Sequence, residues 1–276
     1  MSNLTQRVLT ALVGSFVVVV TLWIGGEVFA LAITAVGLLA QNEVYRLLER
    51  AGTRPLVGLG LALGAVAVLR PVAWMAPVAG PLLVLGGLAV LVAVLFLRTE
   101  TPLLDAAATL FGAAYPAALC GALVALRLDE RAWLAGTHDE AFWLTTAVLF
   151  CVWGADTFAY FTGRALGTHP LFPRVSPKKT WEGAVGGAVG AVLLAAGFKV
   201  FTPLAGVLTW TDVAAVAFAC GIASPFGDLA ESHFKRSVDV KDSASFLPGH
   251  GGMLDRIDAA VVAVPLVVIY LHFAKG

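Results

Sequence analysis

Long apolar stretches alternate with short polar links along almost the whole chain. An α-helix rises about 1.5 Å per residue, so about 20 apolar residues cross the ~30 Å hydrocarbon layer of a bilayer. We mark nine stretches of roughly this kind, at residues 8–24, 28–41, 56–74, 81–97, 106–127, 142–163, 183–201, 211–227 and 257–273. The second is short, and continuation as an interfacial helix through residues 43–50 is an alternative for it. The pattern predicts an all-α, polytopic integral membrane protein with about nine transmembrane helices.

Composition supports a membrane protein. Hydrophobic residues make up 59% of the chain and charged residues 13%, against about 45–50% and about 25% in soluble domains. The formal net charge is zero, so bulk charge gives no indication of a nucleic-acid partner. The cysteines lie in apolar stretches without the spacing of a metal site, and we expect them to pack as small hydrophobic side chains: Cys120, Cys151 and Cys220.

The basic residues indicate which links lie in the cytoplasm. Most of the 18 Lys and Arg residues fall in the N-terminal segment and in the links after the second, fourth, sixth and eighth stretches. Cytoplasmic links carry such an excess. We therefore expect a multi-pass protein of the cell inner (cytoplasmic) membrane, with its N-terminus cytoplasmic and its C-terminus outside. We divide the chain into N-terminal helices at 1–105, a middle helix and polar link at 106–140, and a C-terminal transmembrane domain at 141–276.

Charged residues concentrate between the last two apolar stretches, in residues 224–258. If the first part is a helix, spacings of three and four place five polar side chains on one face: Ser224, Asp228, Glu231, Ser232 and Lys235. Pro225 can kink this helix or loosen its hydrogen-bond ladder. A glycine-rich turn at 248–252 follows, where glycine allows positive φ and close backbone approach to a ligand. It leads into three charged residues: Asp255, Arg256 and Asp258.

Carboxylates from two segments beside Lys and Arg are typical of a Mg²⁺–phosphate site at the cytoplasmic membrane interface. Hard oxygen ligands hold the metal, and the cations bind phosphate oxygens. We expect Asp228 and Asp255 to be the metal ligands. Glu231, Asp258 and Asp156 are further candidates around the same ion or a second cation. The alternative is a solvated loop whose basic residues only set the orientation, but acidic residues contribute little to orientation and are costly at apolar helix ends.

A second charged block begins inside the sixth apolar stretch with Asp156. An Asp within an apolar span usually faces a cavity, a partner or a functional site; an ion pair with a neighbouring helix is the alternative. Further on, Ser176 before Pro177 predicts a helix start with Ser at the N-cap. Lys178, Lys179 and the free amides of that first turn would then form an anion site, unless the two lysines serve orientation alone.

The charged blocks resemble a known family. The run Ser232–His–Phe–Lys–Arg236, the pair Lys241–Asp242 and the run Pro248–Gly–His–Gly–Gly–Met–Leu–Asp–Arg–Ile–Asp258 are similar to the signature of phosphatidate cytidylyltransferases (CDP-diacylglycerol synthases). The block at 156–183 also resembles that family, whereas the N-terminal half does so only in being hydrophobic and helical. The resemblance implies a transferase of phospholipid biosynthesis. It converts phosphatidic acid and CTP, at the lipid bilayer, into CDP-diacylglycerol and pyrophosphate.

The resemblance and the charge pattern together assign the expected roles. Asp228 and Asp255 would hold Mg²⁺. The cations at the reacting phosphates would be Lys235, Arg236, Lys241 and Arg256. The substrate-binding set would be Ser224, Ser232, Lys178, Lys179, His250, Gly251 and Gly252, with His250 favoured as a hydrogen-bonding loop residue over a general base. The lysine pair is assigned either to the triphosphate or to the lipid headgroup.

Three other classes of protein compete with this interpretation. A transporter or channel would also have broken helices and intramembrane charge, but we find no internal repeat and the charge gathers at one face. A CTP-dependent lipid kinase would release CDP in place of pyrophosphate. A structural scaffold gives no reason for the carboxylates between Asp228 and Asp258. The small residues of 183–190 indicate close helix packing within one subunit, with a homodimer interface as the less favoured alternative.

The charge pattern yields a topology test. A reporter fused after Gly276 should behave as non-cytoplasmic, because an odd number of spans carries the C-terminus away from the cytoplasmic N-terminus. Paired fusions of alkaline phosphatase and a fluorescent protein measure this, and a cytoplasmic signal would contradict nine spans.

Overall fold

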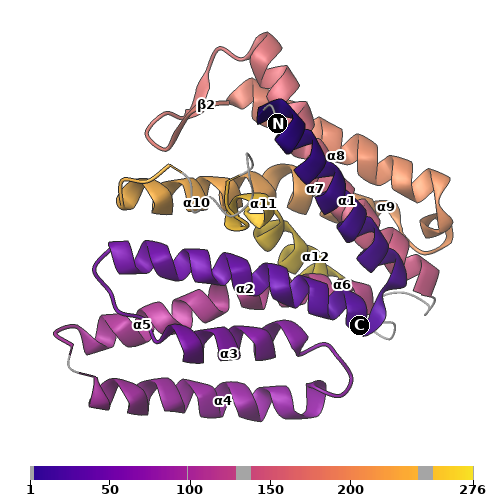
Figure 1. The fold of residues 1–276 in the computed structure, drawn as a ribbon. Coiled ribbons are helices and arrows are strands. Elements are labelled where there is room, and N and C mark those ends of the chain that lie inside the picture. Colours follow the sequence, from indigo (N-terminus) through magenta and orange to yellow (C-terminus); the bar gives the residue numbers. More distant parts are fainter. Residues whose placement is uncertain (1–2, 98, 129–137, 242–250, 276) are drawn as a thin grey trace. The chain divides into compact units, whose positions relative to one another are not determined.

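The computed structural model describes residues 3–97, 99–128, 138–241 and 251–275 (Figure 1). The described chain is largely helical, which confirms the predicted all-α membrane fold. It forms two compact units: unit 1 holds Met1–Ala125 with Phe234–Arg256, and unit 2 holds Leu126–His233 with Ile257–Gly276. The three-part division made from the sequence stays a prediction.

Unit 1 is built mainly from helices of the N-terminal half. They are α1 (Asn3–Ile24), α2 (Gly26–Arg50), α3 (Val57–Leu69), α4 (Ala76–Ala93) with a 3-10 turn (Val94–Phe96), α5 (Pro102–Gly112), a π-helical turn (Ala113–Ala118) and most of α6 (Leu119–Leu128). The C-terminal segment adds the end of α10 (Ser224–Ser237) and most of the short α11 (Leu254–Ile257). Helices α2, α3 and α4 lie side by side (Figure 1). Helix α2 continues without a break to Arg50. This agrees with the alternative in which the short second apolar stretch continues as a helix through residues 43–50.

A buried polar link joins three helices of unit 1. The Tyr45 hydroxyl of α2 donates to the Thr109 carbonyl of α5 over 2.8 Å and accepts from the Gln41 amide over 2.9 Å. The Gln41 amide, also on α2, donates to the Gly60 carbonyl of α3 over 2.7 Å. Gly60 and Gly112 make room for the Tyr45 ring, since a Cβ on either would lie within 2.2 Å of its atoms. Burying the hydroxyl without a partner would cost free energy, so this link favours one packing of α2 against α3 and α5.

Unit 2 is built around a pair of long helices. Its elements are α7 (His138–Leu166), β1 (Pro170–Phe172), β2 (Ser176–Thr180), α8 (Trp181–Phe201), a 3-10 turn (Pro203–Gly206), α9 (Trp210–Phe218), a π-helical turn (Ala219–Ala223), the first part of α10, and α12 (Ala260–Lys275). The strands form an antiparallel hairpin that connects α7 to α8. The sequence did not predict this hairpin.

Helices α7 and α8 pack backbone to backbone through glycines. A Cβ on Gly183 would lie 2.9 Å from the Ala159 carbonyl oxygen, and a Cβ on Gly187 would lie 2.9 Å from the Ala155 carbonyl oxygen. Both glycines are buried. The predicted use of the small residues at 183–190 for close packing within one subunit is therefore confirmed for these two glycines.

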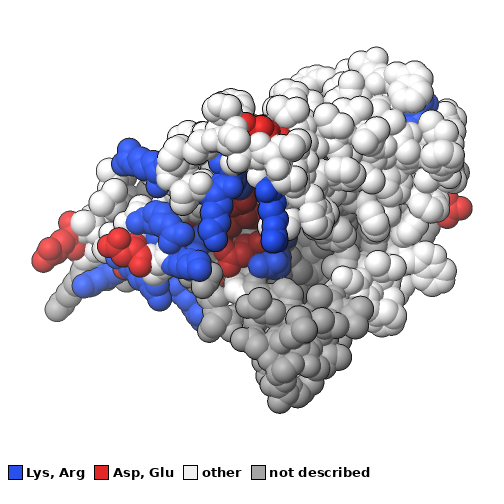
Figure 2. All heavy atoms as spheres, turned by 90° about the horizontal axis from the view of Figure 1, so that it is seen from above, with Lys and Arg blue, Asp and Glu red and all other residues white. Residues whose placement is uncertain are grey.

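The helices have the length and composition expected of a membrane protein. Among the described residues, six helical segments are long and apolar enough to cross a bilayer, and three shorter apolar helices accompany them. Each of the nine stretches marked in the sequence coincides with one of these segments, while the exact number of spans stays a prediction. Much of the surface seen in Figure 2 carries no charged side chain. On helix α4, the apolar side chains of Val84, Leu85 and Leu88 are more than half exposed.

The glycine packing predicts a difference between two alanine substitutions on α8. Gly187→Ala should lower the free energy of unfolding by about 1–3 kcal/mol, the usual cost of overpacking, because its methyl group meets the Ala155 carbonyl. Gly197→Ala is the matched control, since a Cβ there meets nothing within 4 Å. Thermal unfolding in detergent measures both; equal midpoints would contradict the packing.

Candidate active site

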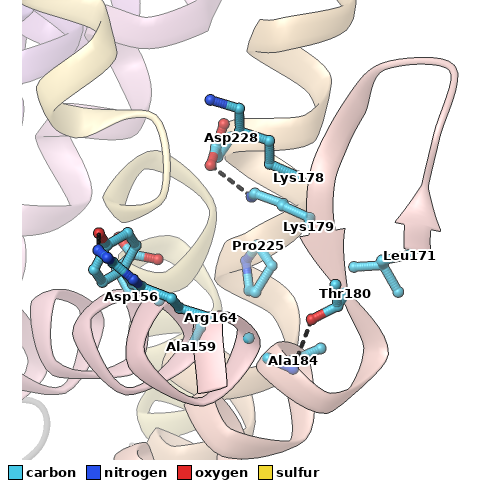
Figure 3. Close-up of a pocket in the computed structure, with 13 residues that line it drawn as sticks. Asp156, Ala159, Arg164, Leu171, Lys178, Lys179, Thr180, Ala184, Pro225 and Asp228 are labelled. Atoms are coloured by element: carbon cyan, nitrogen blue, oxygen red, sulfur yellow. Dashed lines mark hydrogen bonds and ion pairs between the residues drawn. The ribbon is translucent and has the colours of Figure 1, made fainter. Parts of the chain in front are cut away.

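A cavity of about 540 Å³ opens in unit 2 between α7, the hairpin, α8 and α10. Its charged and polar lining residues are Asp156, Tyr160, Arg164, Lys178, Lys179, Thr180 and Asp228. Its apolar wall includes Ala159, Leu171, Ala184 and Pro225. Figure 3 shows these side chains converging from the four elements. The structure thus brings Asp228, from the first charged block of the sequence, into one cavity with residues of the second block.

An ion pair crosses the cavity from the hairpin to α10. Lys179 Nζ lies 2.5 Å from Asp228 Oδ2, and both side chains are partly exposed, at 26% and 33% (Figure 3). Lys178 lines the same cavity beside it. On α7, Arg164 Nη1 donates to the Tyr160 hydroxyl over 3.0 Å. Three cations beside two carboxylates, Asp156 and Asp228, leave an excess of positive charge that favours an oxyanion.

The polar face predicted for α10 is present. Ser232 Oγ donates to Asp228 Oδ1 over 3.2 Å, one helical turn apart. Glu231 is fully buried. The π-helical turn that ends at Ala223 comes just before Pro225, in agreement with the predicted loosening of the ladder. The Ser224 hydroxyl donates over 2.5 Å to the Cys220 carbonyl of its own helical segment, and its substrate-binding role stays a prediction.

Asp258 lies in the turn before α12, close to the α10 carboxylates. Burial, followed by the nearby negative charge of Asp228, raises the pKa of Asp258, while its interaction with Glu231 partly opposes this rise. The backbone is close here too, because a Cβ on Gly227 would lie 2.1 Å from the Asp258 carbonyl oxygen.

The glycine-rich turn and its carboxylate belong to unit 1. Asp255 Oδ1 forms an ion pair with Lys235, and both side chains are largely buried, at 13% and 11% exposed. Asp255 Oδ2 accepts from the Gly252 amide over 2.9 Å. Gly251 has φ of 77°, as the sequence predicted for a glycine in this turn. That Asp255 and Asp228 share one ion stays a prediction, since the two carboxylates lie in different units.

The remaining predicted residues are placed as follows. Arg236 Nη1 donates to the Val240 carbonyl over 3.2 Å, and Lys241 and Arg256 are exposed. Asp242 and His250 lie outside the described residues. The three cysteines are free and buried, as expected.

The predicted helix start at Ser176 is wrong. Ser176–Thr180 pairs as strand β2 with Pro170–Phe172, and α8 begins only at Trp181. Thr180 is the N-cap, because its hydroxyl accepts from the Gly183 amide over 3.1 Å. The Trp181 amide donates to the His169 carbonyl. The two lysines therefore reach the cavity from a strand. They do not lie in the first turn of a helix, so the expected anion site made with the free amides of that turn is not formed at these residues.

Similarity to known proteins shows to which family the chain belongs. A model of the cytidylyltransferase family matches residues 5–274. The chain belongs to the cytidylyltransferase family. A Brucella abortus protein named phosphatidate cytidylyltransferase is 40% identical, covering 98% of this chain and 94% of its own. Proteins of the same name from Pseudomonas aeruginosa and Bacillus subtilis are 36% and 30% identical, each covering 98% of both chains.

The donor set of this cytidylyltransferase suits Mg²⁺. Within the part of the chain that the structure describes, no three His, Cys, Asp or Glu side chains converge as a preformed metal cage. Mg²⁺ does not require one, because it is usually held by one or two carboxylates, waters and substrate phosphates. Asp228 presents a partly exposed carboxylate in the cavity, and Asp156 lines the same space. These oxygen ligands fit the ion.

Sequence reasoning missed the residues that hold the hairpin. Thr168 Oγ1 donates to Glu182 over 2.8 Å, and His169 Nδ1 lies 2.6 Å from the same oxygen. Gly163 and Gly167 leave space for Thr180, whose atoms would lie 3.0 Å or less from a Cβ on either. Thr180 stands immediately before an apolar helical stretch, which is a sequence signal for an N-cap. The Ser176–Pro177 pair is an equally typical helix start, and it was chosen in place of Thr180.

The cap predicts how Thr180 tolerates substitution. Thr180→Val keeps the shape but removes the acceptor, so the free energy of unfolding should fall by about 1 kcal/mol, and the Gly183 amide, which loses its partner, should exchange faster. Thr180→Ser keeps the oxygen and should behave as the wild type. Thermal unfolding and hydrogen-exchange mass spectrometry test both variants; identical behaviour of Val and Ser would refute the capping role.

Proposed function

We propose that this chain is a Mg²⁺-dependent phosphatidate cytidylyltransferase that transfers CMP from CTP to phosphatidic acid for phospholipid biosynthesis. The single observation that carries the proposal is the cationic cavity with Lys178, Lys179 and Asp228, in a chain whose full-length relatives bear that name.

The chemistry explains why such a cavity is needed. A phosphate oxygen of phosphatidic acid attacks the α-phosphorus of CTP, a new P–O bond forms, and the bond to pyrophosphate breaks. Two polyanions must meet, so positive charge has to offset their repulsion. Such transfers depend mainly on positioning and charge stabilisation. A covalent nucleophile is not required, and the lipid phosphate is already largely ionised near neutral pH, so neither is a strong base.

The side chains divide this work by charge. Lys178, Lys179 and Arg164 bind phosphate oxygens in the cavity of unit 2. Lys235, Arg236, Lys241 and Arg256 are the proposed cations of the second cluster. Lys179 is held in place by Asp228 until an oxyanion competes for it, since an ion pair this exposed is weak.

Asp228 and Asp255 are the proposed Mg²⁺ ligands, and Asp156, Glu231 and Asp258 are further candidates around the same ion or a second cation. When bound, the ion supplies positive charge to the phosphate oxygens. A second cation bound by the same carboxylates is also proposed. The protein is further proposed to lie in the inner (cytoplasmic) membrane, with its N-terminus and its active site on the cytoplasmic side. A homodimer remains the less favoured alternative to packing within one subunit.

The test is product formation by purified protein in detergent with phosphatidic acid, CTP and Mg²⁺. Wild type should release pyrophosphate and form CDP-diacylglycerol, detected by mass spectrometry. Asp228→Asn and Asp255→Asn should each lower kcat by at least about 100-fold, the scale of losing one charge-stabilising group. Chelation with EDTA should stop turnover, and Mg²⁺ should restore it.

Asp239→Asn is the matched control. It lies in the same charged segment, is exposed, and has φ of 56°, which Asn tolerates well, so its activity should equal that of the wild type. Release of CDP with phosphorylation of a lipid alcohol would favour the kinase alternative. Absence of both CTP binding and chemistry would contradict a cytidylyltransferase activity.

A further inference from the structure

A buried carboxylate of the N-terminal half contacts the glycine-rich turn near the other end of the chain. Glu43 lies on α2, among buried neighbours such as Val44 and Tyr45, and is only 3% exposed. Its Oε1 accepts from the Met253 amide over 2.8 Å, and its Oε2 accepts from the Leu254 amide over 3.0 Å. All of these residues belong to unit 1. Sequence analysis gave Glu43 no role beyond a place in the second helix.

The geometry of this contact is that of an anchor for α11. Amides at a helix start lack partners within the helix. A carboxylate buried among apolar side chains is costly unless it is hydrogen-bonded. Glu43 and the amides of Met253 and Leu254 therefore satisfy one another, and the fully buried Leu254 fixes the same turn by packing.

The anchored turn carries Asp255. Three successive amides, at Gly252, Met253 and Leu254, all donate to carboxylates: the first to Asp255 and the other two to Glu43. Asp255 is held on its other oxygen by Lys235. Hence the orientation of the Asp255 carboxylate depends on the course of a backbone that Glu43 holds on its opposite side.

From this arrangement we infer that Glu43 is a positioning residue for Asp255, an inference that rests on the proposed function. Glu43 does not touch substrate; it sets the backbone from which Asp255 and its partner Lys235 act. Misplacement of a reacting group by about 1 Å can cost on the order of 100-fold in rate. The N-terminal half thus contributes to catalysis through one side chain.

Glu43→Gln is the sharpest variant because it keeps the size and reach of the side chain. An amide offers one acceptor oxygen and an NH₂ group. Because Met253 and Leu254 each donate to a different oxygen of Glu43, one of these two amides would face the NH₂ group of Gln. Exchange of these two amides should accelerate about 10-fold or more, the scale of losing a hydrogen bond to a charged acceptor. Hydrogen-exchange mass spectrometry of peptides covering 251–257 measures this without any turnover.

Kinetics should separate positioning from general damage. In Glu43→Gln, kcat should fall by about 10–100-fold, while KM for CTP changes little, the pattern of a loss confined to the transition state. Exchange in peptides from α3 and α5 should match the wild type. Glu49→Gln is the matched control: it removes the same charge from an exposed position on the same helix and should alter neither readout.

The possible outcomes each decide the matter. Wild-type exchange at 251–257 in a folded Glu43→Gln protein, or faster exchange there with unchanged kcat, overturns the inference while leaving the proposed function intact. Faster exchange throughout unit 1 reduces Glu43 to a structural residue and also overturns it. If wild type forms no CDP-lipid, the proposed function falls, and the positioning role falls with it. Should Glu43→Gln not fold, Glu43→Asp replaces it, since the shorter carboxylate cannot reach both amides; wild-type values there overturn the inference.

Discussion

The close approach of α7 and α8 is the constraint on which unit 2 depends. At Gly183 and Gly187 the two backbones leave no room for a side chain. The approach fixes one wall of the cavity, because Ala159 and Gly163 on α7 face Gly183 and Ala184 on α8. It also fixes the base of the hairpin, which has to connect two helix ends that lie almost in contact. Lys178 and Lys179 are held over the cavity as a result.

In both units several charged side chains are paired with an opposite charge close by. Lys179 meets Asp228, and Lys235 meets Asp255. Asp212, at the start of α9, binds Lys275 and the Tyr270 hydroxyl of α12 over 2.8 Å each. Such pairing is expected where apolar helices exclude water, because an isolated charge there is costly. The first two pairs involve groups that phosphate or metal can compete for, whereas the last one joins α9 to α12.

Apolar length and small-residue spacing were enough to predict the helices and the close packing of the small residues of α8, because both patterns are local in sequence; that α7 is the partner came only from the structure. Local pattern likewise predicted the face of α10 that carries Asp228 and Ser232, and the positive φ of Gly251. The strand at Ser176–Thr180 could not be predicted, since its pairing with β1 depends on tertiary contacts and the Ser–Pro pair is equally typical of a helix start. Glu43 was missed for a different reason: hydrogen bonds across 210 residues leave no periodic signal.

The contact between α2 and α11 also bears on how the protein is made. Leu254 lies 211 residues after Glu43, so synthesis at ~5–20 residues per second separates the two by on the order of 10–40 s. Helix α2 must therefore enter the membrane before the amides that bind its carboxylate exist. Unit 1 acquires its last piece only when the C-terminal segment has been translated. Nascent chains that stall before that point carry an N-terminal bundle whose acidic side chain has not met its donors.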